Sequence, residues 1–463
     1  MFANCYPKLK PKSRLTKETN RVVLYEVDRG EKFLSLHPIH ALALTLCDGS
    51  SSFEAISTGL SEVFDYSPLQ AKELVSDLLK QAYEFIDLGS EPYSELNDRY
   101  DPSEFVYEPT EAKWTNKLEV PNTVVWMTTN RCPADCVYCV IPTLKANEFA
   151  PNELNTEQAF HFLKECVDLG VKYINLHGGD PFLRKDMVEI IEYLLSNDIF
   201  VDVSTKMPLR ESLIERLAKA GLDTLQVSVD SNLPKLADEI VRVKNWLPKI
   251  NQTIDLCQKY NLKVRANIVV TTKNINGIPS LLNYLINRKN IKDIGMSAYL
   301  RSEHKHDDSL LITQEQRERL IQQVNEISAQ YPDVKIGNIS AISERDISLS
   351  IPGFGSCSGG KTALVVGSDG ECATCDRTMP YSEARIGNVK ESSIADIWNG
   401  NALEYLLDPP MEAYKGTSCY ECDHFQQCNV RQRCFYRARL INGKLFAPDY
   451  LCAKLPEPPI EMF

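Results

Sequence analysis

The sequence predicts an α/β protein built around a partial (β/α)6 TIM-type barrel, with a winged-helix-like domain before the barrel and a cysteine-rich domain after it. Three observations support this fold class. Between residues 121 and 300, short apolar runs alternate with amphipathic stretches, a pattern typical of parallel β/α units. Before them, an alternating segment leads into three helical patterns. After about residue 345, the chain becomes rich in turns and cysteines.

Six apolar runs are the expected barrel strands. They are 124–129, 173–178, 201–206, 225–230, 263–271 and 293–299. In a barrel of parallel strands the chemistry is carried at the carboxyl ends of the strands. Polar residues at those ends are therefore candidate site residues.

The N-terminal domain is expected to contain a β-hairpin over 22–36, because its residues alternate and Asp28 to Glu31 supply a turn. Helical spacing then predicts three short helices. The first is closed by Gly49, and the second begins at Ser51 or Ser52. The lysines and arginines before the hairpin are expected to form a solvated tail. The predicted domains are 1–100, a linker over 101–120, the barrel over 121–345 and the cysteine-rich domain over 346–463.

The composition excludes several classes of function. The net charge of −12 argues against nonspecific binding to nucleic acid and against docking on anionic membranes. No apolar run is long enough for a transmembrane helix, and the N-terminus lacks the apolar stretch of a signal peptide. We therefore expect a cytoplasmic protein with no nucleic-acid or membrane partner.

Fifteen cysteines are many for a cytoplasmic chain, and clustered thiols in a reducing compartment indicate metal ligands or redox groups. Three lie within residues 132–139 and eight within residues 357–452. Of the four others, Cys5 lies near the N-terminus. Cys47, Cys166 and Cys257 lie in apolar helical patterns and are expected to be inert core thiols.

Directly after the first expected barrel strand, Cys132, Cys136 and Cys139 have the spacing C-x3-C-x2-C. Three thiolates on one loop can bind three irons of a cubane cluster and leave the fourth iron open. S-adenosylmethionine (SAM) can chelate that iron through its amino and carboxylate groups. The alternatives are a zinc site or chance spacing, but structural zinc takes four protein ligands and no fourth lies nearby.

These residues resemble the radical SAM superfamily, over residues 121–300. Tyr138 precedes the last cysteine, as is usual in that family. The resemblance implies that a reduced [4Fe–4S] cluster cleaves SAM to a 5′-deoxyadenosyl radical. It also implies an electron donor such as flavodoxin or ferredoxin.

The second strand ends in Gly178-Gly179-Asp180-Pro181, which resembles the family's Gly-Gly-Glu-Pro motif. That motif holds the amino group of SAM, and glycines let backbone approach a ligand closely. Aspartate in place of glutamate is a departure from the motif. The alternative is an ordinary turn.

Four polar residues at the ends of strands three and four occupy places where relatives touch the ribose of SAM. They are Ser204, Lys206, Ser228 and Asp230. For each, the alternative is a polar residue that is satisfied within the protein.

The eight late cysteines and the turns between them resemble the SPASM domain, which binds two auxiliary iron–sulfur clusters. They are Cys357, Cys372, Cys375, Cys419, Cys422, Cys428, Cys434 and Cys452. In the preferred register, Gly370 and Cys375 fit the family pattern better than Gly367 and Cys372.

The SPASM resemblance implies that the distal cluster is bound by Cys419, Cys422, Cys428 and Cys452. It implies that the proximal cluster is bound by Cys357, Cys375 and Cys434. A fourth proximal ligand is open: it is Cys372, or the iron is free for substrate. With the radical SAM cluster, three clusters are expected. The alternative is a zinc ribbon built from two Cys-x2-Cys pairs.

Asp376 directly follows Cys375. In sulfatase-maturing relatives, the matching aspartate takes a proton from the substrate during oxidation. The resemblance thus makes Asp376 a candidate catalytic base. The alternative is a surface aspartate that pairs with Arg377 or caps a turn.

Residues 22–88 resemble the RiPP recognition element, where RiPPs are ribosomally made and post-translationally modified peptides. The resemblance implies that a leader peptide adds as a strand to the hairpin edge. Residues 22–100 carry 14 acidic and 5 basic side chains, which disfavours a DNA-binding winged helix and favours a basic leader. A degenerate domain that only packs on the barrel is the remaining alternative.

Together, these resemblances imply a maturase that abstracts hydrogen from a precursor peptide. The product is a crosslink, a thioether, an excised residue or an oxidised side chain, and the sequence does not choose among them. One rival is a sulfatase-maturing enzyme, which needs no leader-binding domain. Another is a non-enzymatic, metal-dependent peptide-binding scaffold or chaperone.

Overall fold

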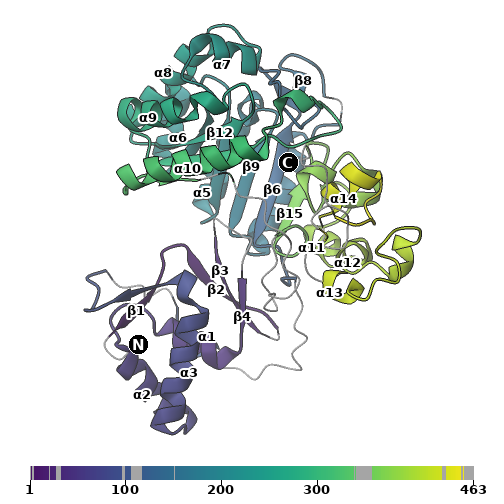
Figure 1. The fold of residues 1–463 in the computed structure, drawn as a ribbon. Helices are drawn as coiled ribbons and strands as arrows, with labels where there is room; N and C mark the ends of the chain where they lie inside the picture. Colours follow the sequence, from purple (N-terminus) through teal and green to yellow (C-terminus); the bar gives the residue numbers. More distant parts are fainter. Residues whose placement is uncertain are drawn as a thin grey trace. The chain divides into compact units, whose positions relative to one another are not determined.

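The computed structural model describes residues 2, 5–19, 21–27, 33–95, 100–105, 117–150, 152–337, 339, 357–429, 434–449 and 452. Contacts within the chain divide it into two compact units (Figure 1). The smaller unit comprises Met1–Asn122 and Ser348–Thr362. The larger unit comprises Thr123–Ile347 and Ala363–Phe463, so the barrel and the cysteine-rich segment share one unit.

The smaller unit combines short strands with three helices. Its elements are β1 (Tyr6–Leu9), β2 (Ser13–Lys17), β3 (Val22–Glu26), β4 (Phe33–Leu36), α1 (Pro38–Thr45), α2 (Phe53–Phe64), α3 (Pro68–Gln81), η1 (Tyr83–Phe85), β5 (Ile86–Gly89) and η2 (Pro102–Phe105). β3 and β4 pair antiparallel, as the alternation predicts. The turn predicted at Asp28 to Glu31 lies outside the described residues.

The predicted solvated tail is wrong, because residues 6–17 form two strands. β1 pairs with β5, and β2 pairs with β3, so that the order of the main sheet is β2-β3-β4. Leu9 and Leu15 alternate with lysines and arginines and are buried in the core of the unit. The basic residues therefore lie on the polar faces of strands.

Serines cap two helices of the smaller unit, and the cap of α2 is one that the sequence predicts. Ser52 accepts a hydrogen bond from Ala55 N at 3.2 Å and caps α2. Ser67 caps α3 in a reciprocal capping box with Gln70. Gly49 does not close α1, which ends at Thr45. Gly49 instead turns the chain after the helix, with a φ of +93°.

Part of the predicted linker also belongs to the smaller unit. Phe105, in η2, is buried in the core of this unit and Tyr100 packs against that core. The N–H of Leu15 in β2 donates a hydrogen bond of 2.8 Å to the hydroxyl of Tyr100. This segment therefore closes the outer edge of β2.

The larger unit is built on one sheet that includes the six predicted barrel strands, which run parallel. Its strands are β6 (Thr123–Thr129), β9 (Tyr173–Gly178), β10 (Phe200–Thr205), β11 (Thr224–Ser228), β12 (Lys263–Val270), β13 (Asp293–Ala298), β14 (Lys335–Ile336), β15 (Ala363–Val366), β16 (Glu371–Ala373) and β17 (Arg385–Asn388). Their order is β14-β13-β12-β11-β10-β9-β6-β15-β16-β17.

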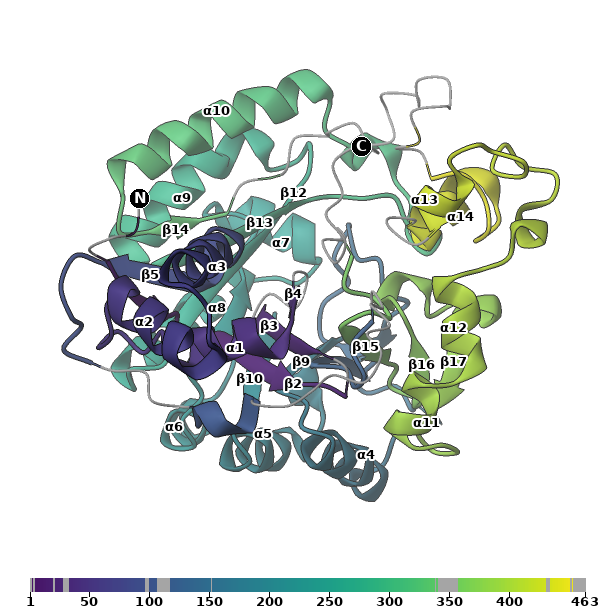
Figure 2. The same ribbon diagram turned by 90° about the horizontal axis from the view of Figure 1, so that it is seen from below.

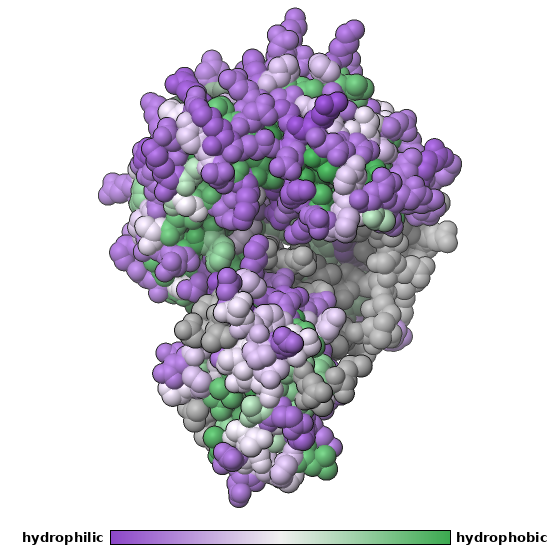
Figure 3. Space-filling model, turned by 90° about the vertical axis from the view of Figure 1, so that its left-hand side faces the viewer, coloured by the Kyte–Doolittle hydropathy of each residue, from purple (hydrophilic) through white to green (hydrophobic). Residues whose placement is uncertain are grey.

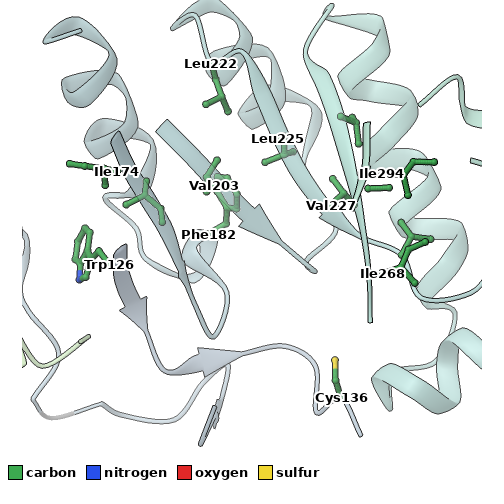
Figure 4. Close-up of a cluster of buried hydrophobic side chains, with 14 of the residues drawn as sticks. Trp126, Cys136, Ile174, Phe182, Val203, Leu222, Leu225, Val227, Ile268 and Ile294 are labelled. Carbon is green, nitrogen blue, oxygen red and sulfur yellow. The ribbon is translucent and has the colours of Figure 1, made fainter. Parts of the chain in front are cut away.

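Helices cover the outer face of the barrel strands (Figures 1 and 2). They are α4 (Thr156–Asp168), α5 (Met187–Ser196), α6 (Glu211–Lys219), α7 (Pro234–Val241), α8 (Trp246–Lys259), α9 (Ile278–Lys289) and α10 (Gln314–Gln330). Alternate strand residues such as Val203, Leu225 and Val227 are buried in the core of this unit (Figure 4). The residues between them lie on the opposite, inward face of the strands.

The C-terminal segment extends the barrel sheet. β15 pairs parallel with β6, and β16 and β17 follow as antiparallel strands. Beyond them lie α11 (Ile394–Trp398), α12 (Asn401–Leu407), α13 (Phe425–Asn429) and α14 (Phe435–Asn442). The sequence did not predict this continuity, because β15 returns to the edge of β6 from more than 200 residues away.

Polar side chains dominate much of the surface visible in Figure 3. In the part of the chain that is described, every helix is too short or too polar to cross a membrane.

Candidate active site

The three cysteines of the loop after β6 lie on a segment that is anchored at several points. Cys132 belongs to β7 (Arg131–Cys132), which pairs with β8 (Leu144–Lys145). The N–H groups of Asp135 and Val137 donate hydrogen bonds to backbone carbonyls in the last turn of α7, at 3.2 and 2.9 Å. The side chain of Asp135 pairs with Arg242 at 2.9 Å and also with Lys305. The loop is therefore held by two other segments of the barrel.

The three thiols share one electrostatic environment. Burial raises the pKa of Cys132 to about 12 and that of Cys136 to about 11, and each also feels the charge of Cys139. The positive charge of Lys206 acts in the opposite direction and lowers the pKa of Cys136. Thiolates at such positions need positive partners, and iron bound to them would supply the charge.

These residues fit a cubane cluster better than a single ion. In the described part of the chain, no three Cys, His, Asp or Glu side chains are grouped to share one metal ion. A zinc site requires such convergence, whereas in a cubane cluster each thiolate binds its own iron. All three thiols are free and half-buried or buried, as iron ligands beside a barrel mouth would be.

Gly178 and Gly179 are required by the approach of two backbone segments. Gly178 has a φ of +126°, and a Cβ there would lie 2.5 Å from the carbonyl oxygen of Thr129. A Cβ on Gly179 would lie 2.0 Å from the carbonyl oxygen of Arg131. The backbone N–H of Gly179 donates to Thr129 at 2.6 Å. The glycines thus let β9 pack against the start of the cysteine loop. The sequence analysis had explained the same glycines by the close approach of SAM.

Asp180 is fully buried and binds groups of the protein itself. Its carboxylate accepts hydrogen bonds from Thr205 Oγ1 and from the backbone N–H groups of Phe182, Lys206 and Met207, at 2.9 to 3.2 Å. Burial raises the pKa of Asp180 to about 6, and these bonds oppose the shift. A carboxylate has about four acceptor sites, so four donors saturate it. The expected contact with the amino group of SAM is not supported by this geometry.

Lys206 and Asp230 bind each other and Tyr138. Lys206 Nζ lies 2.8 Å from Asp230 Oδ2, and the hydroxyl of Tyr138 donates to the same oxygen at 2.6 Å. Asp230 Oδ1 accepts a bond of 3.0 Å from the N–H of Val269. All three side chains are largely buried. They therefore fix the cysteine loop on strand ends rather than present three free groups to a ribose.

Ser204 and Ser228 differ from that trio. Both lie on the inward faces of β10 and β11, opposite the core residues Val203 and Val227 (Figure 4). Neither hydroxyl is bonded to another group in the described part of the chain. They remain candidates for contact with the ribose of SAM.

Cys372 and Cys375 are placed differently. Cys372 is fully buried in the barrel core, where its thiol donates to the carbonyl of Gly370 at 3.7 Å and contributes to the raised pKa of Cys166. Cys375 is half-buried, and its sulfur lies 3.4 Å from Asp376 Oδ1. The two thiols therefore do not share a site, which disfavours Cys372 as the missing ligand. The predicted core thiols Cys47, Cys166 and Cys257 are buried as expected.

The later cysteines lie on turns and short helices. The N–H of Cys422 donates to the carbonyl of Cys419 at 3.3 Å, so these two are joined by a tight turn. Cys428 follows within α13 and is half-buried. Cys357 is exposed and belongs to the smaller unit.

Asp449 is a buried residue that the sequence analysis did not single out. Its carboxylate forms an ion pair of 2.6 Å with Arg437 and accepts a bond of 3.2 Å from the N–H of Cys434. Its carbonyl accepts a bond of 2.9 Å from the N–H of Cys452. Asp449 thereby brings Cys434 and Cys452 together. The only sequence signal is an aspartate three residues before the last cysteine.

A cavity of about 390 Å³ connects these parts of the larger unit. Its wall includes Val140, Ile141 and Pro142, which directly follow Cys139. The lining also includes Asp376 and Arg377, which directly follow Cys375. Residues 302–304 after β13, Met127 of β6 and Tyr436 of α14 are among the other lining residues. The cavity thus lies between the cysteine loop and the first half-buried cysteine of the C-terminal segment.

Comparison with known proteins agrees with this geometry. The radical SAM superfamily matches residues 126–285, which contain the end of β6, the cysteine loop and the next four barrel strands. The SPASM iron–sulfur cluster-binding domain matches residues 357–423. The chain is a radical SAM enzyme with a SPASM domain.

Curated relatives of this radical SAM enzyme include proteins with different substrates. A PqqA peptide cyclase from Granulibacter bethesdensis is 26% identical over 351 residues, which cover 73% of this chain and 89% of that protein. An AdoMet-dependent heme synthase from Methanosarcina barkeri is 24% identical and covers 73% of this chain and 97% of its own length.

Solved structures share the fold of this radical SAM enzyme. Streptococcus suis SuiB bound to S-adenosylmethionine aligns over 96% of this chain and 100% of its own, with a TM-score of 0.66 and 17% identity. SuiB has also been solved with the precursor peptide SuiA. The enzyme anSMEcpe with bound AdoMet aligns over 71% of this chain and 90% of its own, with a TM-score of 0.52 and 16% identity.

Proposed function

We propose that this radical SAM enzyme modifies a ribosomally made precursor peptide. The leader of the peptide binds the smaller unit as an added strand, and a core residue enters the cavity of the larger unit. The proposal rests on the edge of β4, which pairs with no second strand in the described residues. Similarity to PqqA peptide cyclases and to SuiB supports a peptide substrate.

The two edges of the β2-β3-β4 sheet differ. Tyr100 closes the edge of β2 through its bond to Leu15. In the described residues, β4 pairs only with β3, so its outer N–H and carbonyl groups have no strand partner. Natural proteins usually protect such edges, and an unprotected one is a template for strand addition. The leader is thus expected on β4.

The net negative charge of residues 22–100 suggested a basic leader, but the net charge is smaller when the first 21 residues are included. Residues 1–21 carry six basic side chains and one acidic side chain, so residues 1–100 have a net charge of −4 instead of the −9 of residues 22–100. Those basic residues belong to β1, β2 and the turns beside them. Leader selection is therefore assigned to backbone pairing on β4 and to apolar contacts.

Three iron–sulfur clusters are proposed. Cys132, Cys136 and Cys139 would hold the cluster that binds SAM. Cys419, Cys422, Cys428 and Cys452 would hold a distal auxiliary cluster, and Cys357, Cys375 and Cys434 a proximal one. Because Cys372 lies in the core, the proximal cluster has no fourth cysteine in this assignment.

SAM and its cluster, when bound, supply the radical that removes a hydrogen atom from the core residue. When bound, the proximal cluster would accept one electron from the substrate, and Asp376, which lines the cavity, would take the proton. Asp376 Oδ1 is held by the N–H of Arg377 at 2.9 Å, which leaves Oδ2 for a proton. A flavodoxin or ferredoxin is the proposed electron donor. The sulfatase-maturing alternative leaves the smaller unit without a role.

The experiment is anaerobic incubation of the reconstituted full chain with SAM, a reductant and a precursor peptide encoded beside its gene. We expect a mass change on the core peptide that requires both SAM and the leader. A chain that modifies a leaderless core peptide equally well would contradict the role of the smaller unit. A chain that leaves SAM intact would be the non-enzymatic scaffold.

A further inference from the structure

Two arginines line the cavity of the larger unit, and they differ in their partners. Arg385 lies 3.9 Å from Glu371. Arg377 is half-buried, and its guanidinium forms no ion pair in the described part of the chain. Its Nη1 atom is buried and has no hydrogen-bond partner among the described residues. Buried donors are almost always paired, so this guanidinium calls for a partner that enters the cavity.

The side chain of Arg377 is oriented by its neighbours. Its guanidinium carbon lies 5.4 Å from the centre of the Tyr436 ring, within the range of a cation–π contact. Tyr436 is itself buried, and its hydroxyl donates a hydrogen bond of 2.6 Å to the carbonyl of Arg301. The backbone N–H of Arg377 donates to Asp376 Oδ1 at 2.9 Å. A group that is oriented before its ligand binds loses less entropy on binding.

The cavity lining also contains four carboxylates, and each of them is already bound by a group other than the guanidinium of Arg377. The pairs are Glu371 with Arg385 at 3.9 Å, Glu303 with Arg439 at 3.4 Å, Asp369 with the N–H of Glu371 at 3.2 Å, and Asp376 with the N–H of Arg377 at 2.9 Å. The positive charge of Arg377 is therefore not neutralised by an ion pair within the described lining.

Six apolar side chains also line the cavity. They are Met127, Val140, Ile141, Pro142, Met379 and Pro380. An occupant that suits this lining has apolar atoms and one group that can pair with a guanidinium. A carboxylate is the group that matches best, because its two oxygens accept two parallel N–H bonds from the planar fork of arginine.

We propose that Arg377 binds a carboxylate of the core peptide and thereby selects which core residue enters the cavity. This inference rests on the proposed function, in which a precursor peptide is the substrate. The carboxylate belongs to an acidic side chain or to the C-terminus of the core peptide, since both present the same two oxygens. Arg377 forms and breaks no covalent bond. It fixes the position of the core residue by a charge-assisted hydrogen bond.

The test begins with the substrate and uses the reconstituted full chain, SAM, a reductant and the precursor peptide encoded beside its gene. In a set of peptides, each Asp or Glu of the core is changed in turn to Asn or Gln, and one further peptide ends in an amide. We expect one neutral peptide to lose about 10- to 100-fold in kcat/KM, the usual effect of losing a hydrogen bond to a charged group. That peptide identifies the source of the carboxylate. Equal kcat/KM for every peptide would overturn the inference.

Variants of Arg377 then link the preference to this side chain. Arg377→Met should lose a similar factor with the natural peptide and should no longer distinguish it from the neutral peptide, because the partner is already gone. Arg377→Lys keeps the charge without the planar fork and should retain part of the preference. Arg385→Met is the matched control and should keep the wild-type preference, because Arg385 is already paired with Glu371. A preference that survives in Arg377→Met, or that disappears equally in Arg385→Met, would overturn the assignment.

Two measurements without peptide separate this role from others. Iron content and SAM cleavage in the absence of peptide should be the same in Arg377→Met and in the wild-type chain. Loss of iron would assign Arg377 to a cluster, and loss of SAM cleavage would assign it to the carboxylate of SAM, so either result would overturn the inference. A wild-type chain that forms no product removes the proposed function as well, whereas a productive chain that accepts all neutral peptides equally removes only the role of Arg377.

Discussion

Cys372 and Cys375 are three residues apart in the sequence, but their thiols lie in different surroundings. Cys372 is fully buried in the barrel core beside Cys166, whereas Cys375 is half-buried with its sulfur 3.4 Å from Asp376. The pair thus contains one structural thiol and one candidate iron ligand. This difference favours the register in which Cys375, and not Cys372, is matched to the SPASM pattern. The sequence analysis preferred the same register.

Cys375→Ala should lower the iron content of the reconstituted chain by about one cluster, or roughly four irons, because alanine cannot ligate iron. Cys372→Ala should leave the iron content unchanged and cost only the small cavity that the lost sulfur leaves. Iron and sulfide analysis with absorbance spectra checks both variants. Iron loss in Cys372→Ala would mean that the other register is correct.

Arg21 is expected to control the stability of the β3–β4 hairpin. It forms a buried ion pair of 2.6 Å with Glu18, in which the side chains are 5% and 7% exposed. It also binds Ser35 Oγ at 2.9 Å and the carbonyl of Lys117 at 2.7 Å. Arg21→Ala removes the charge partner of this buried carboxylate, and breaking a buried ion pair typically costs about 3–5 kcal/mol.

Hydrogen exchange of the β3 and β4 amides should report this loss as faster opening in Arg21→Ala. The control is Lys80→Ala, because the pair of Lys80 with Asp77 is largely exposed and worth at most about 1 kcal/mol. Equal exchange in both variants would show that the buried pair does not stabilise the hairpin.

Leader binding should depend on backbone donors. A proline placed within the leader segment that pairs with β4 removes one N–H and should weaken binding to the full chain. A proline outside that segment should not. Fluorescence anisotropy of labelled leader peptides measures both affinities. If no position in the leader is sensitive to proline, strand addition to β4 is not the mode of binding.

Asp376→Asn should preserve folding, iron content and SAM cleavage in the absence of peptide. It should reduce peptide product by about 10²-fold or more, the usual effect of losing a general base. Product measured by mass spectrometry and iron measured in parallel separate the outcomes. Unchanged product would make Asp376 a structural residue, and a loss of iron would assign it to support of the cluster.

Local sequence signals predicted the elements that depend on nearby residues. The six barrel strands follow from apolar runs, and Ser52 marks the start of α2. The cysteine loop was predicted because its three cysteines lie within eight residues. In each case the decisive contacts are short-range.

Features that depend on distant contacts were missed or misassigned. β1 and β2 resembled a polar tail because lysines and arginines occupy their exposed faces. For Asp180 the sequence predicted a contact with SAM, because its partners Thr205, Lys206 and Met207 lie about 25 residues away, at and just after the end of β10. Asp449 belongs to no motif, and only the fold places it between Cys434 and Cys452.

The central claim is that this chain removes a hydrogen atom from a peptide with a radical derived from SAM. The most direct measurement is deuterium transfer from a core peptide with deuterated side chains into 5′-deoxyadenosine, read by mass spectrometry under anaerobic, reducing conditions. We predict deuterium in 5′-deoxyadenosine with the wild-type chain, and no 5′-deoxyadenosine when Cys132, Cys136 and Cys139 are all changed to alanine. Persistent SAM cleavage in that variant, or peptide product without deuterium transfer from any labelled position, would contradict the claim.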